Sequence, residues 1–399
     1  MSGSIAITGF GFVGAPGCGS QAAAQALARG QAVVRPIDDV SGYLPAGAPR
    51  TAALVDREDL APHLLPGQAR RMSPPARYAV AAARMALAEA GLADVEEGGG
   101  PAAVVLATAF GPASYSERLC RQIFLEGPEA ASPALFTECV ASAAASQVAI
   151  SCGAHGVNLT VVQREAGPLA AVLRAAEEVA SGRARRALAG SVDEVTPLLL
   201  AALAQMRALG EPCRPFDRAR AGMLAGEGAA VLLLEREDEA RARGARVLAT
   251  VEAGVRAFDP TAGRAGWGRG GEALAGRLRA GLARASLAEG TVDAVVSGAS
   301  GARTGDALEA AVLRAWRAEL PPVLVPKAVL GEYGGSLLAG ALLAVQGRPF
   351  GPTPHFREPE RDGIVPHDGR TLPPPRRVLV TALAAGGAAT WMVLGAARA

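Results

Sequence analysis

Lysine and aromatic residues are scarce in this 399-residue chain. Lys327 is the only lysine, and aromatic side chains make up 4% of the residues. The net charge is +2 at pH 7, because 38 acidic residues nearly balance 40 basic ones. A chain so close to neutrality lacks the strong positive charge that attracts nucleic acids or anionic membranes. We therefore expect no nucleic acid and no membrane among its partners.

Cysteine is also scarce and follows no recognisable spacing. Five cysteines occur singly, with no CxxC pair and no histidine at metal-ligand spacing. An odd number of scattered thiols argues against a disulfide framework or a zinc site, and it favours a reducing, cytoplasmic compartment. The four histidines all lie in loop-like sequence. We expect no metal and no cofactor.

Long hydrophobic runs are missing as well. No apolar stretch reaches the ~18 residues that a membrane-spanning helix needs, so no membrane span is predicted. Residues 1–13 carry no basic side chain, which argues against a secretory signal.

The composition that remains is typical of a globular protein, since half of the residues are hydrophobic and 49 are glycine. Strand-like and helix-like segments alternate along the whole chain, which predicts parallel sheets covered by helices on both faces. Length and alternation together predict two similar halves, residues 1–245 and 246–399, although no sequence repeat relates them.

The first predicted strand, residues 4–8, leads into residues 9–14 (GFGFVG), which match the GxGxxG pattern of dinucleotide-binding turns. In such sites a helix follows at once, and its N-terminus holds the pyrophosphate. Pro16, Gly17 and Gly19 would break that helix here. We interpret the pattern as a tight structural turn, not as a nicotinamide site.

The most informative stretch is residues 156–182. Residues 158–162 alternate and are β-branched, which predicts a short strand. A polar turn follows, and from Pro168 apolar residues recur at helical spacing as far as Gly182. Many enzymes hold a nucleophile in such a strand–turn–helix frame, because the helix dipole favours negative charge. The turn in this chain offers Glu165, which is a poor nucleophile for acyl transfer.

Several stretches together resemble the β-ketoacyl synthases of the thiolase superfamily. Residues 7–11 (ITGFG) resemble that family's opening strand and turn, and residues 77–92 (RYAVAAARMALAEAGL) resemble its first long helix. Residues 214–235 (RPFDRARAGMLAGEGAAVLLLE) resemble its most recognisable segment. The resemblance covers nearly the whole chain. It implies an α/β, thiolase-like fold with five layers in the order αβαβα, two similar halves, and action as a dimer.

The resemblance also implies where the catalytic residues of the family would lie, and three of these positions hold other residues. The nucleophilic cysteine corresponds to Glu165, and the first histidine to Gly298 in the stretch 298–306 (GASGARTGD). The second histidine corresponds to Glu332 in the stretch 327–332 (KAVLGE). A gating phenylalanine near the C-terminus is absent from residues 384–387 (AAGG).

Two further family positions, Lys327 and Asp306, are retained, and we expect them to form a structural ion pair. For Glu165 the simplest hypothesis is that it fills the old pocket and pairs with an arginine, either Arg164 or one from a partner.

Condensation needs a thiolate to carry the acyl chain and two neutral imidazoles to stabilise the developing enolate. A carboxylate at Glu165 would give an unstable anhydride, and Glu332 would repel the enolate. We therefore expect no condensing activity from this chain alone.

Within the family, the chain resembles the chain-length factors, or ketosynthase β subunits, of type II polyketide synthases. Those subunits have lost the cysteine, often to glutamine, and residues 162–169 (VQREAGPL) resemble their version of the turn. The resemblance implies a catalytically silent subunit that pairs with an active ketosynthase, shapes the polyketide tunnel and sets chain length. It also implies an acyl carrier protein as a partner. Two alternatives stay open: a malonyl-carrier-protein decarboxylase that primes synthesis, and a carrier-protein-docking scaffold.

Finally, the resemblance implies which residues face the partner. In the family, strand 158–162 pairs with its mate across the two-fold axis, and residues 110–124 reach over to the partner's tunnel. Aromatic side chains in such a segment are more often ordinary core residues. The residues expected at the dimer interface are Asn158, Leu159, Thr160, Val161 and Val162, and those expected at the tunnel are Phe110, Ser114, Tyr115 and Phe136.

Overall fold

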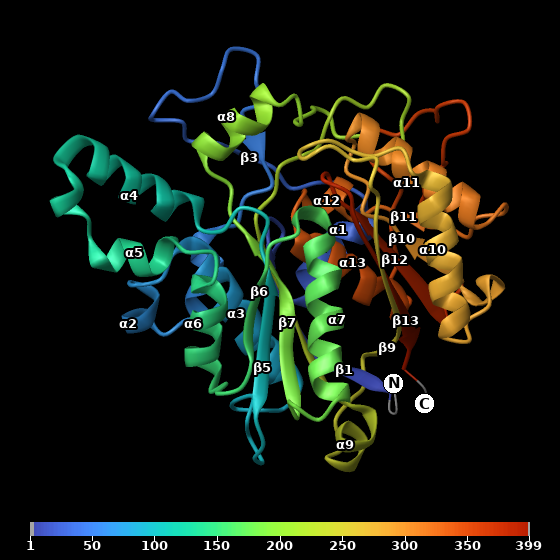
Figure 1. The fold of residues 1–399 in the computed structure, drawn as a ribbon, viewed down its shortest axis with the longest axis horizontal. Helices are drawn as coiled ribbons and strands as arrows, with labels where there is room; N and C mark the ends of the chain where they lie inside the picture. The colour runs from blue at the N-terminus through green and yellow to red at the C-terminus, as the bar shows by residue number, and fades with distance from the viewer. Residues whose placement is uncertain (1–3, 398–399) are drawn as a thin grey trace.

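A computed structural model describes residues 4–397 of the chain, and its strands form two series (Figure 1). The first series, in the order β1-β8-β7-β5-β6, precedes residue 245, and the second, in the order β9-β13-β12-β10-β11, follows it. Each series therefore runs first, fifth, fourth, second, third. The strands are β1 (Ile5–Gly14), β5 (Ala102–Ala107), β6 (Asn158–Val161), β7 (Arg186–Asp193), β8 (Gly228–Arg236), β9 (Ala249–Phe258), β10 (Ala294–Val296), β11 (Val323–Leu324), β12 (Arg377–Leu383) and β13 (Ala388–Ala396).

The two series join where β1 and β9 pair antiparallel over residues 5–7 and 249–251. The repeated strand order is what two similar halves require, and a boundary at residues 245 and 246 falls between α9 (Glu237–Ala242) and β9.

Each series is mixed, so the prediction of parallel sheets was wrong for part of each sheet. β5 pairs in parallel with β6 and β7, whereas β8 pairs antiparallel with β7 and β1. The same holds for β13 against β12 and β9. Parallel pairing needs a crossover helix, and here β12 and β13 are joined by a hairpin.

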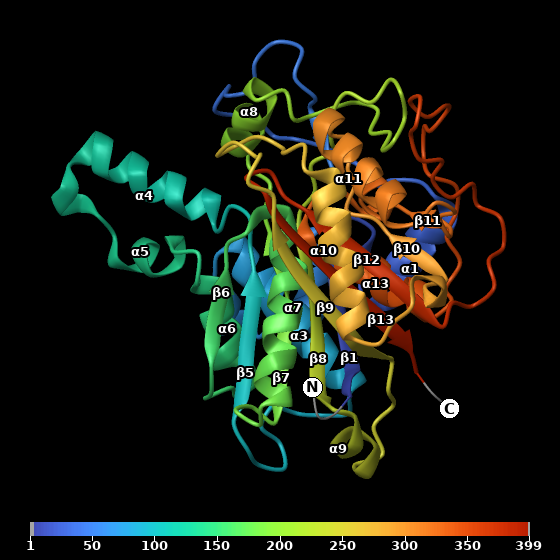
Figure 2. The same ribbon diagram turned by 45° about the vertical axis from the view of Figure 1, so that its right-hand side comes forward.

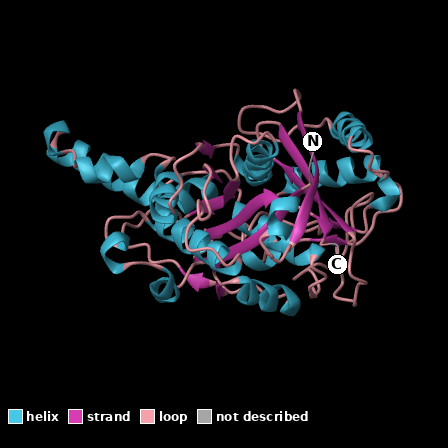
Figure 3. Ribbon diagram, turned by 90° about the horizontal axis from the view of Figure 1, so that it is seen from below, coloured by secondary structure: helices cyan, strands magenta, loops and turns pink. Residues whose placement is uncertain are grey.

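Three layers of helices enclose the strands, which gives the predicted αβαβα order (Figure 3). The layers are α3 (Pro74–Glu89) with α6 (Ala143–Cys152), then α7 (Gly167–Ala180) with α13 (Gly334–Val345), then α10 (Gly271–Arg284) with α11 (Arg303–Trp316). The central α13 is buried at every residue from 335 to 345, because its sequence is apolar on all sides.

Residues 9–14 belong to strand β1, so our interpretation of them as a tight turn was wrong. The glycines serve the packing of α3 instead. A Cβ atom on Gly11 would lie 1.8 Å from the backbone oxygen of Ala82, and one on Gly9 would lie 2.0 Å from that of Ala86. Glycine is therefore required so that helix and strand backbones can approach each other closely.

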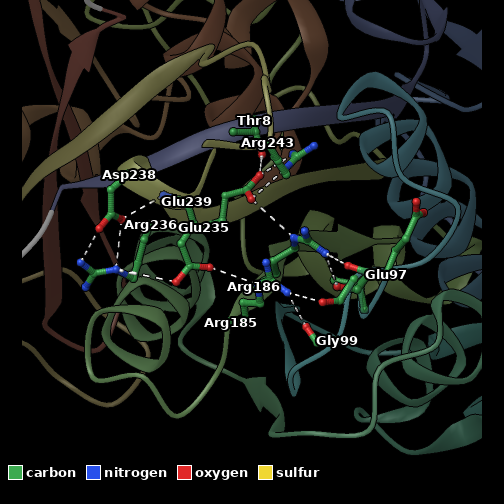
Figure 4. A network of polar contacts seen from close by, with 12 residues as sticks. Thr8, Glu97, Gly99, Arg185, Arg186, Glu235, Arg236, Asp238, Glu239 and Arg243 are labelled. Carbon is green, nitrogen blue, oxygen red and sulfur yellow. Dashed lines mark hydrogen bonds and ion pairs between the residues drawn. The ribbon is translucent and has the colours of Figure 1, made fainter. Parts of the chain in front are cut away.

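A buried ionic network ties the lower end of the first sheet together (Figure 4). Glu235 on β8 accepts hydrogen bonds from Thr8 on β1 (2.5 Å) and Arg243 (2.6 Å), and its other oxygen lies 3.4 Å from Arg186 on β7. Three strands thus share one carboxylate, whose burial is compensated by these charged donors.

A helical hairpin projects from the body and is visible at the left in Figures 1 and 2. It consists of α4 (Ala113–Glu126) and α5 (Pro133–Cys139), and we call residues 113–139 the arm. Among residues 4–397 no single helix is long and apolar enough to span a membrane. Helices α5 and α6 meet that test only as a pair bent by 94°, by length and composition alone.

The remaining elements are short. They are β2 (Gly17–Cys18), α1 (Ser20–Arg29), β3 (Arg35–Pro36), β4 (Thr51–Ala52), α2 (Pro66–Ala69), α8 (Pro197–Gln205) and α12 (Lys327–Leu330).

Candidate functional site

The strand–turn–helix frame around Glu165 forms as predicted. Strand β6 ends at Val161, a 3-10 turn covers residues 164–166, and α7 begins at Gly167 with Pro168 in its first turn. Arg164 has a φ angle of +47°, which turns the chain sharply between strand and helix. Glu165 is therefore held directly in front of the α7 N-terminus.

The carboxylate of Glu165 faces the loop between β12 and β13. Its Oε2 atom accepts a hydrogen bond from the backbone N–H of Ala385 at 3.3 Å. Burial raises the pKa of Glu165, the charge of Glu332 raises it further, and Lys327 opposes the shift. No ion pair joins Glu165 to Arg164 in the described part of the chain, because the Arg164 side chain lies in solvent. The expected pairing with Arg164 is therefore absent, whereas a pairing with an arginine from a partner stays a prediction.

The only lysine of the chain belongs to the same cluster. Its Nζ atom lies 2.7 Å from Oε1 of Glu332, and the Lys327 side chain is 2% exposed. The other carboxylate oxygen of Glu332 is buried without a hydrogen-bond partner. An ion pair between Lys327 and Asp306 was expected, and that expectation was wrong.

Asp306 is fully buried near the start of α11 and forms no ion pair with Lys327. It binds backbone N–H groups instead. Its carboxylate accepts backbone N–H groups of Phe216 (2.9 Å), Ser300 (3.1 Å) and Gly301 (3.1 Å). Burial raises the pKa of Asp306 to about 6, and these hydrogen bonds limit the shift. Asp306 thus fixes the loop 298–306 through backbone hydrogen bonds, and the charge of Arg220 also limits the rise in its pKa.

Gly298 lies at the start of that loop and has no room for a side chain. A Cβ atom there would lie 2.7 Å from the backbone oxygen of Thr381. The Gly298 N–H is 3.2 Å from Oε1 of Glu309, which also accepts from the hydroxyls of Ser297 (2.6 Å) and Thr381. Burial raises the pKa of Glu309 to about 7. A histidine at position 298 would require the backbone to move.

The chemistry available to this cluster is limited to carboxyl groups and one ammonium. In the described residues, none of the four histidines hydrogen-bonds to Glu165, Lys327 or Glu332. One thiol lies near Asp306 and Glu332: the Sγ atom of Cys213 donates a hydrogen bond to the backbone oxygen of Ser300 at 3.2 Å. Burial raises its pKa to about 12, so it is a thiol and not a nucleophilic thiolate at neutral pH.

The residues predicted to line a tunnel lie at or near the arm. Phe110 precedes α4 and is 52% exposed, and Phe136 on α5 is 61% exposed. Ser114 is instead turned toward the body, where both its N–H and its hydroxyl bond to Glu194. Tyr115 packs under Arg118 and donates to the backbone oxygen of Met72 at 3.4 Å.

The residues predicted at a dimer interface lie in and next to β6. Among the described strands, β6 is last in its series, so one of its edges is unpaired. Asn158 and Val162 are exposed, and the three residues between them, Leu159, Thr160 and Val161, are half-buried. The arm and this edge lie on the same side of the molecule (Figure 2).

Four buried carboxylates near these residues escaped the sequence reasoning: Glu138, Asp193, Glu194 and Glu309. The available signal was an acidic residue at the end of an apolar strand or on the apolar face of a helix, as with Asp193, the last residue of β7, and Glu309 in α11. An acidic residue is rarely buried unless its carboxylate is paired with a cation or accepts hydrogen bonds.

Comparison with known proteins gives a consistent result. Residues 2–240 match the family model of the β-ketoacyl synthase N-terminal domain. A 3-oxoacyl-[acyl-carrier-protein] synthase 2 from Vibrio harveyi is 28% identical over 61% of this chain, and the alignment spans 60% of that relative, which is less than two thirds of its length.

Two further similarities extend over most or all of the chain. The tetracenomycin polyketide synthase ketoacyl synthase β subunit of Streptomyces glaucescens is 31% identical over 86% of this chain and 85% of its own length. Among solved structures, the ishigamide ketosynthase/chain length factor superposes with a TM-score of 0.87 at 28% identity, covering 99% of this chain and 100% of that chain.

Proposed function

This chain belongs to the β-ketoacyl synthase family, and on that premise we propose that it is a chain-length factor of a type II polyketide synthase. In this role it performs no condensation itself. It pairs with an active ketosynthase and shapes the tunnel in which the polyketide grows, which sets the chain length. The proposal is supported by the alignment with a ketosynthase β subunit over 86% of the chain.

One observation carries the proposal: of the residues that we assign to the family's catalytic positions, Glu165 is a carboxyl with a raised pKa and Glu332 forms a buried ion pair with Lys327. In this condensation a thiolate first takes up the acyl chain as a thioester. Loss of CO₂ from the malonyl thioester then gives an enolate, which attacks that thioester and releases the thiolate, so a site needs a thiolate and neutral hydrogen-bond donors. Negative charge at Glu332 opposes an enolate at that position. The third position, Gly298, lacks room for an imidazole.

The partner that fits this role is a ketosynthase that retains the cysteine. The unpaired edge of β6 and the exposed apolar side chains of the arm lie together on one side, which supports pairing through that side. An unpaired strand edge next to apolar side chains favours association. An acyl carrier protein would then bring each malonyl extender unit to the partner's active site, where the cysteine thiol holds the growing acyl chain as a thioester.

The test is to co-express this chain with a cysteine-containing ketosynthase and a carrier protein. We expect a heterodimer that makes polyketide, no product when either subunit is omitted, and no product from this chain alone. The purified chain should also release no CO₂ from malonyl-carrier protein above background.

Release of CO₂ by the chain alone would replace the proposal with the decarboxylase alternative. A heterodimer whose product lengths stay the same when this subunit is exchanged for another chain-length factor would reduce its role to that of a carrier-protein scaffold.

A further inference from the structure

The segment 108–114 leads from β5 into the arm and carries Phe110. It makes a tight turn in which Gly111 has a φ angle of +66° and donates its N–H to the hydroxyl of Thr108 at 2.9 Å. The Phe110 ring is half exposed at the crest of this turn. Helix α4 begins at Ala113, directly after this turn. It has no side-chain cap, because Pro112 occupies the N-cap position, and the first turn of the helix contains no acidic residue.

Two consecutive carboxylates at the end of β7 hold the two ends of this segment. Asp193 accepts a hydrogen bond from the hydroxyl of Thr108 at 3.0 Å and another from the backbone N–H of Ala109 at 2.7 Å. Glu194 accepts the N–H of Ser114 at 2.8 Å, and the Ser114 hydroxyl lies 3.0 and 2.9 Å from its two oxygens. Both carboxylates are buried, at 5% and 3% exposed.

The position of these carboxylates follows from the sheet. β5 and β7 pair in parallel, with Ala107 opposite Ser191, so the residues after both strands emerge at the same edge (Figure 1). Neighbouring residues Asp193 and Glu194 therefore reach opposite ends of the same turn. Glu194 also places a carboxylate at the uncapped N-terminus of α4, where it satisfies a free N–H and complements the helix dipole.

Phe110 is thus the exposed part of a segment whose ends are clamped. Buried hydrogen bonds to a carboxylate are among the stronger ones in proteins, and a single rigid segment holds a ring far more narrowly than a free loop does. The Phe110 side chain is about half exposed, so its position follows mainly from the backbone that Asp193 and Glu194 hold on either side.

We propose that Asp193 and Glu194 are positioning residues for chain length: by clamping residues 108–114 they fix how far Phe110 projects toward the partner's tunnel. This inference rests on the proposed function and adds to it a determinant of chain length that does not touch the polyketide. If the Phe110 ring is held in one position, we expect polyketides of one length. If the ring can occupy several positions, we expect polyketides of several lengths.

The test compares heterodimers that contain wild-type chain, Glu194→Ala, Glu194→Gln or Ser114→Ala, with Glu319→Ala as a matched control at an exposed site in the other half of the chain. Product lengths are measured by mass spectrometry, and amide hydrogen exchange is measured over residues 108–116. Glu194→Ala should speed exchange there by roughly tenfold, the change expected from the loss of a charge-assisted hydrogen bond. The same variant should spread the products toward longer chains.

Glu194→Gln keeps an acceptor oxygen for the Ser114 N–H and should restore most of the wild-type distribution, which a general loss of packing would not do. Ser114→Ala removes only the hydroxyl bond and should give a smaller change in the same direction, so it serves as the second variant if Glu194→Ala does not fold. Glu319→Ala should match wild type in both measurements.

Faster exchange over residues 108–116 with an unchanged product distribution would overturn the inference, and so would unchanged exchange in Ser114→Ala and Glu194→Ala alike. Failure of the proposed function looks different, because the wild-type heterodimer itself would then make no polyketide.

Discussion

The Nζ atom of Lys327 lies 2.7 Å from Oε1 of Glu332, inside the protein and next to the raised-pKa carboxyl of Glu165. The sole lysine of the chain is thereby committed to a carboxylate at a position where an active relative is expected to hold a neutral imidazole. The ion pair compensates a charge that would otherwise be buried alone, and it leaves one oxygen of Glu332 without a partner.

The first prediction concerns the ion pair itself. Glu332→Gln leaves the Lys327 ammonium buried with weaker compensation, so we expect the free energy of unfolding to fall by about 3–5 kcal/mol. The double variant Lys327→Met/Glu332→Gln removes both charges and should recover most of that loss. Urea unfolding of the single and double variants measures this. Equal losses in both would mean that the ion pair has no energetic role.

The second prediction concerns Glu165. If the subunit is catalytically silent, Glu165→Ala should leave the condensing rate of the heterodimer within about threefold of wild type, which is less than 1 kcal/mol of activation free energy. The rate of polyketide formation at saturating carrier protein is the measurement. A loss of about a hundredfold in a heterodimer that still assembles would assign Glu165 a catalytic role.

The third prediction concerns the exposed ring of Phe110. An added ring closes an apolar tunnel by sterics at a cost of about 1–3 kcal/mol, whereas each CH₂ buried in open apolar space gains about 0.8 kcal/mol. Phe110→Ala should therefore shift the products toward longer chains. Tyr115→Ala, which we also expected to face the chain, should have a smaller effect because its hydroxyl bonds to the body. Wild-type product lengths in both variants would place the determinant elsewhere.

The fourth prediction is that stability falls as pH rises from about 4 to 7. Burial raises the pKa of Asp193 and Asp306 from 3.8 to about 6, and that of Glu194 and Glu309 from 4.5 to about 7. In this window the folded protein binds more protons than the unfolded chain, so the free energy of unfolding decreases with increasing pH. At about 1.4 kcal/mol for each pKa unit, every one of these raised pKa values corresponds to roughly 3 kcal/mol of unfolding free energy.

Carboxyl groups whose pKa is lowered, such as Glu235, lose their contribution to stability only below about pH 4.5. They therefore do not change how stability depends on pH between about 4.5 and 7. The check is urea unfolding at pH 5.5 and pH 8 for wild type and Glu309→Gln, with exposed Glu319→Gln as the control. Glu309→Gln should have the shallower dependence. Stability that rises from pH 5.5 to pH 8 in wild type would contradict the raised pKa values.

The sequence alone determined the elements that depend on neighbours along the chain. The helix from Pro168 ends near Gly182 because proline suits a first turn and glycine suits a stop, and both are local preferences. The motifs were sufficient to predict the family and the αβαβα fold, which the structure and the comparisons confirm. The alternation of strands and helices did not predict that β8 and β13 pair antiparallel with their neighbours. Whether two strands pair in parallel depends on whether the segment between them crosses back over the sheet.

Only the tertiary structure decided which distant groups meet. Lys327 pairs with Glu332 and not with Asp306. Residues 9–13 lie in a strand because they pair with β8, and α3 packs against Gly9 and Gly11. Asp193 and Glu194 reach residues 108–114 only because β5 and β7 lie side by side. An apolar strand or helix face around an acidic residue indicates that the carboxylate is buried, but it does not indicate which donors the carboxylate meets. Its role is decided by the donors that folding brings within about 3 Å, as from 80 residues away for Glu194 and from 90 residues away for Asp306.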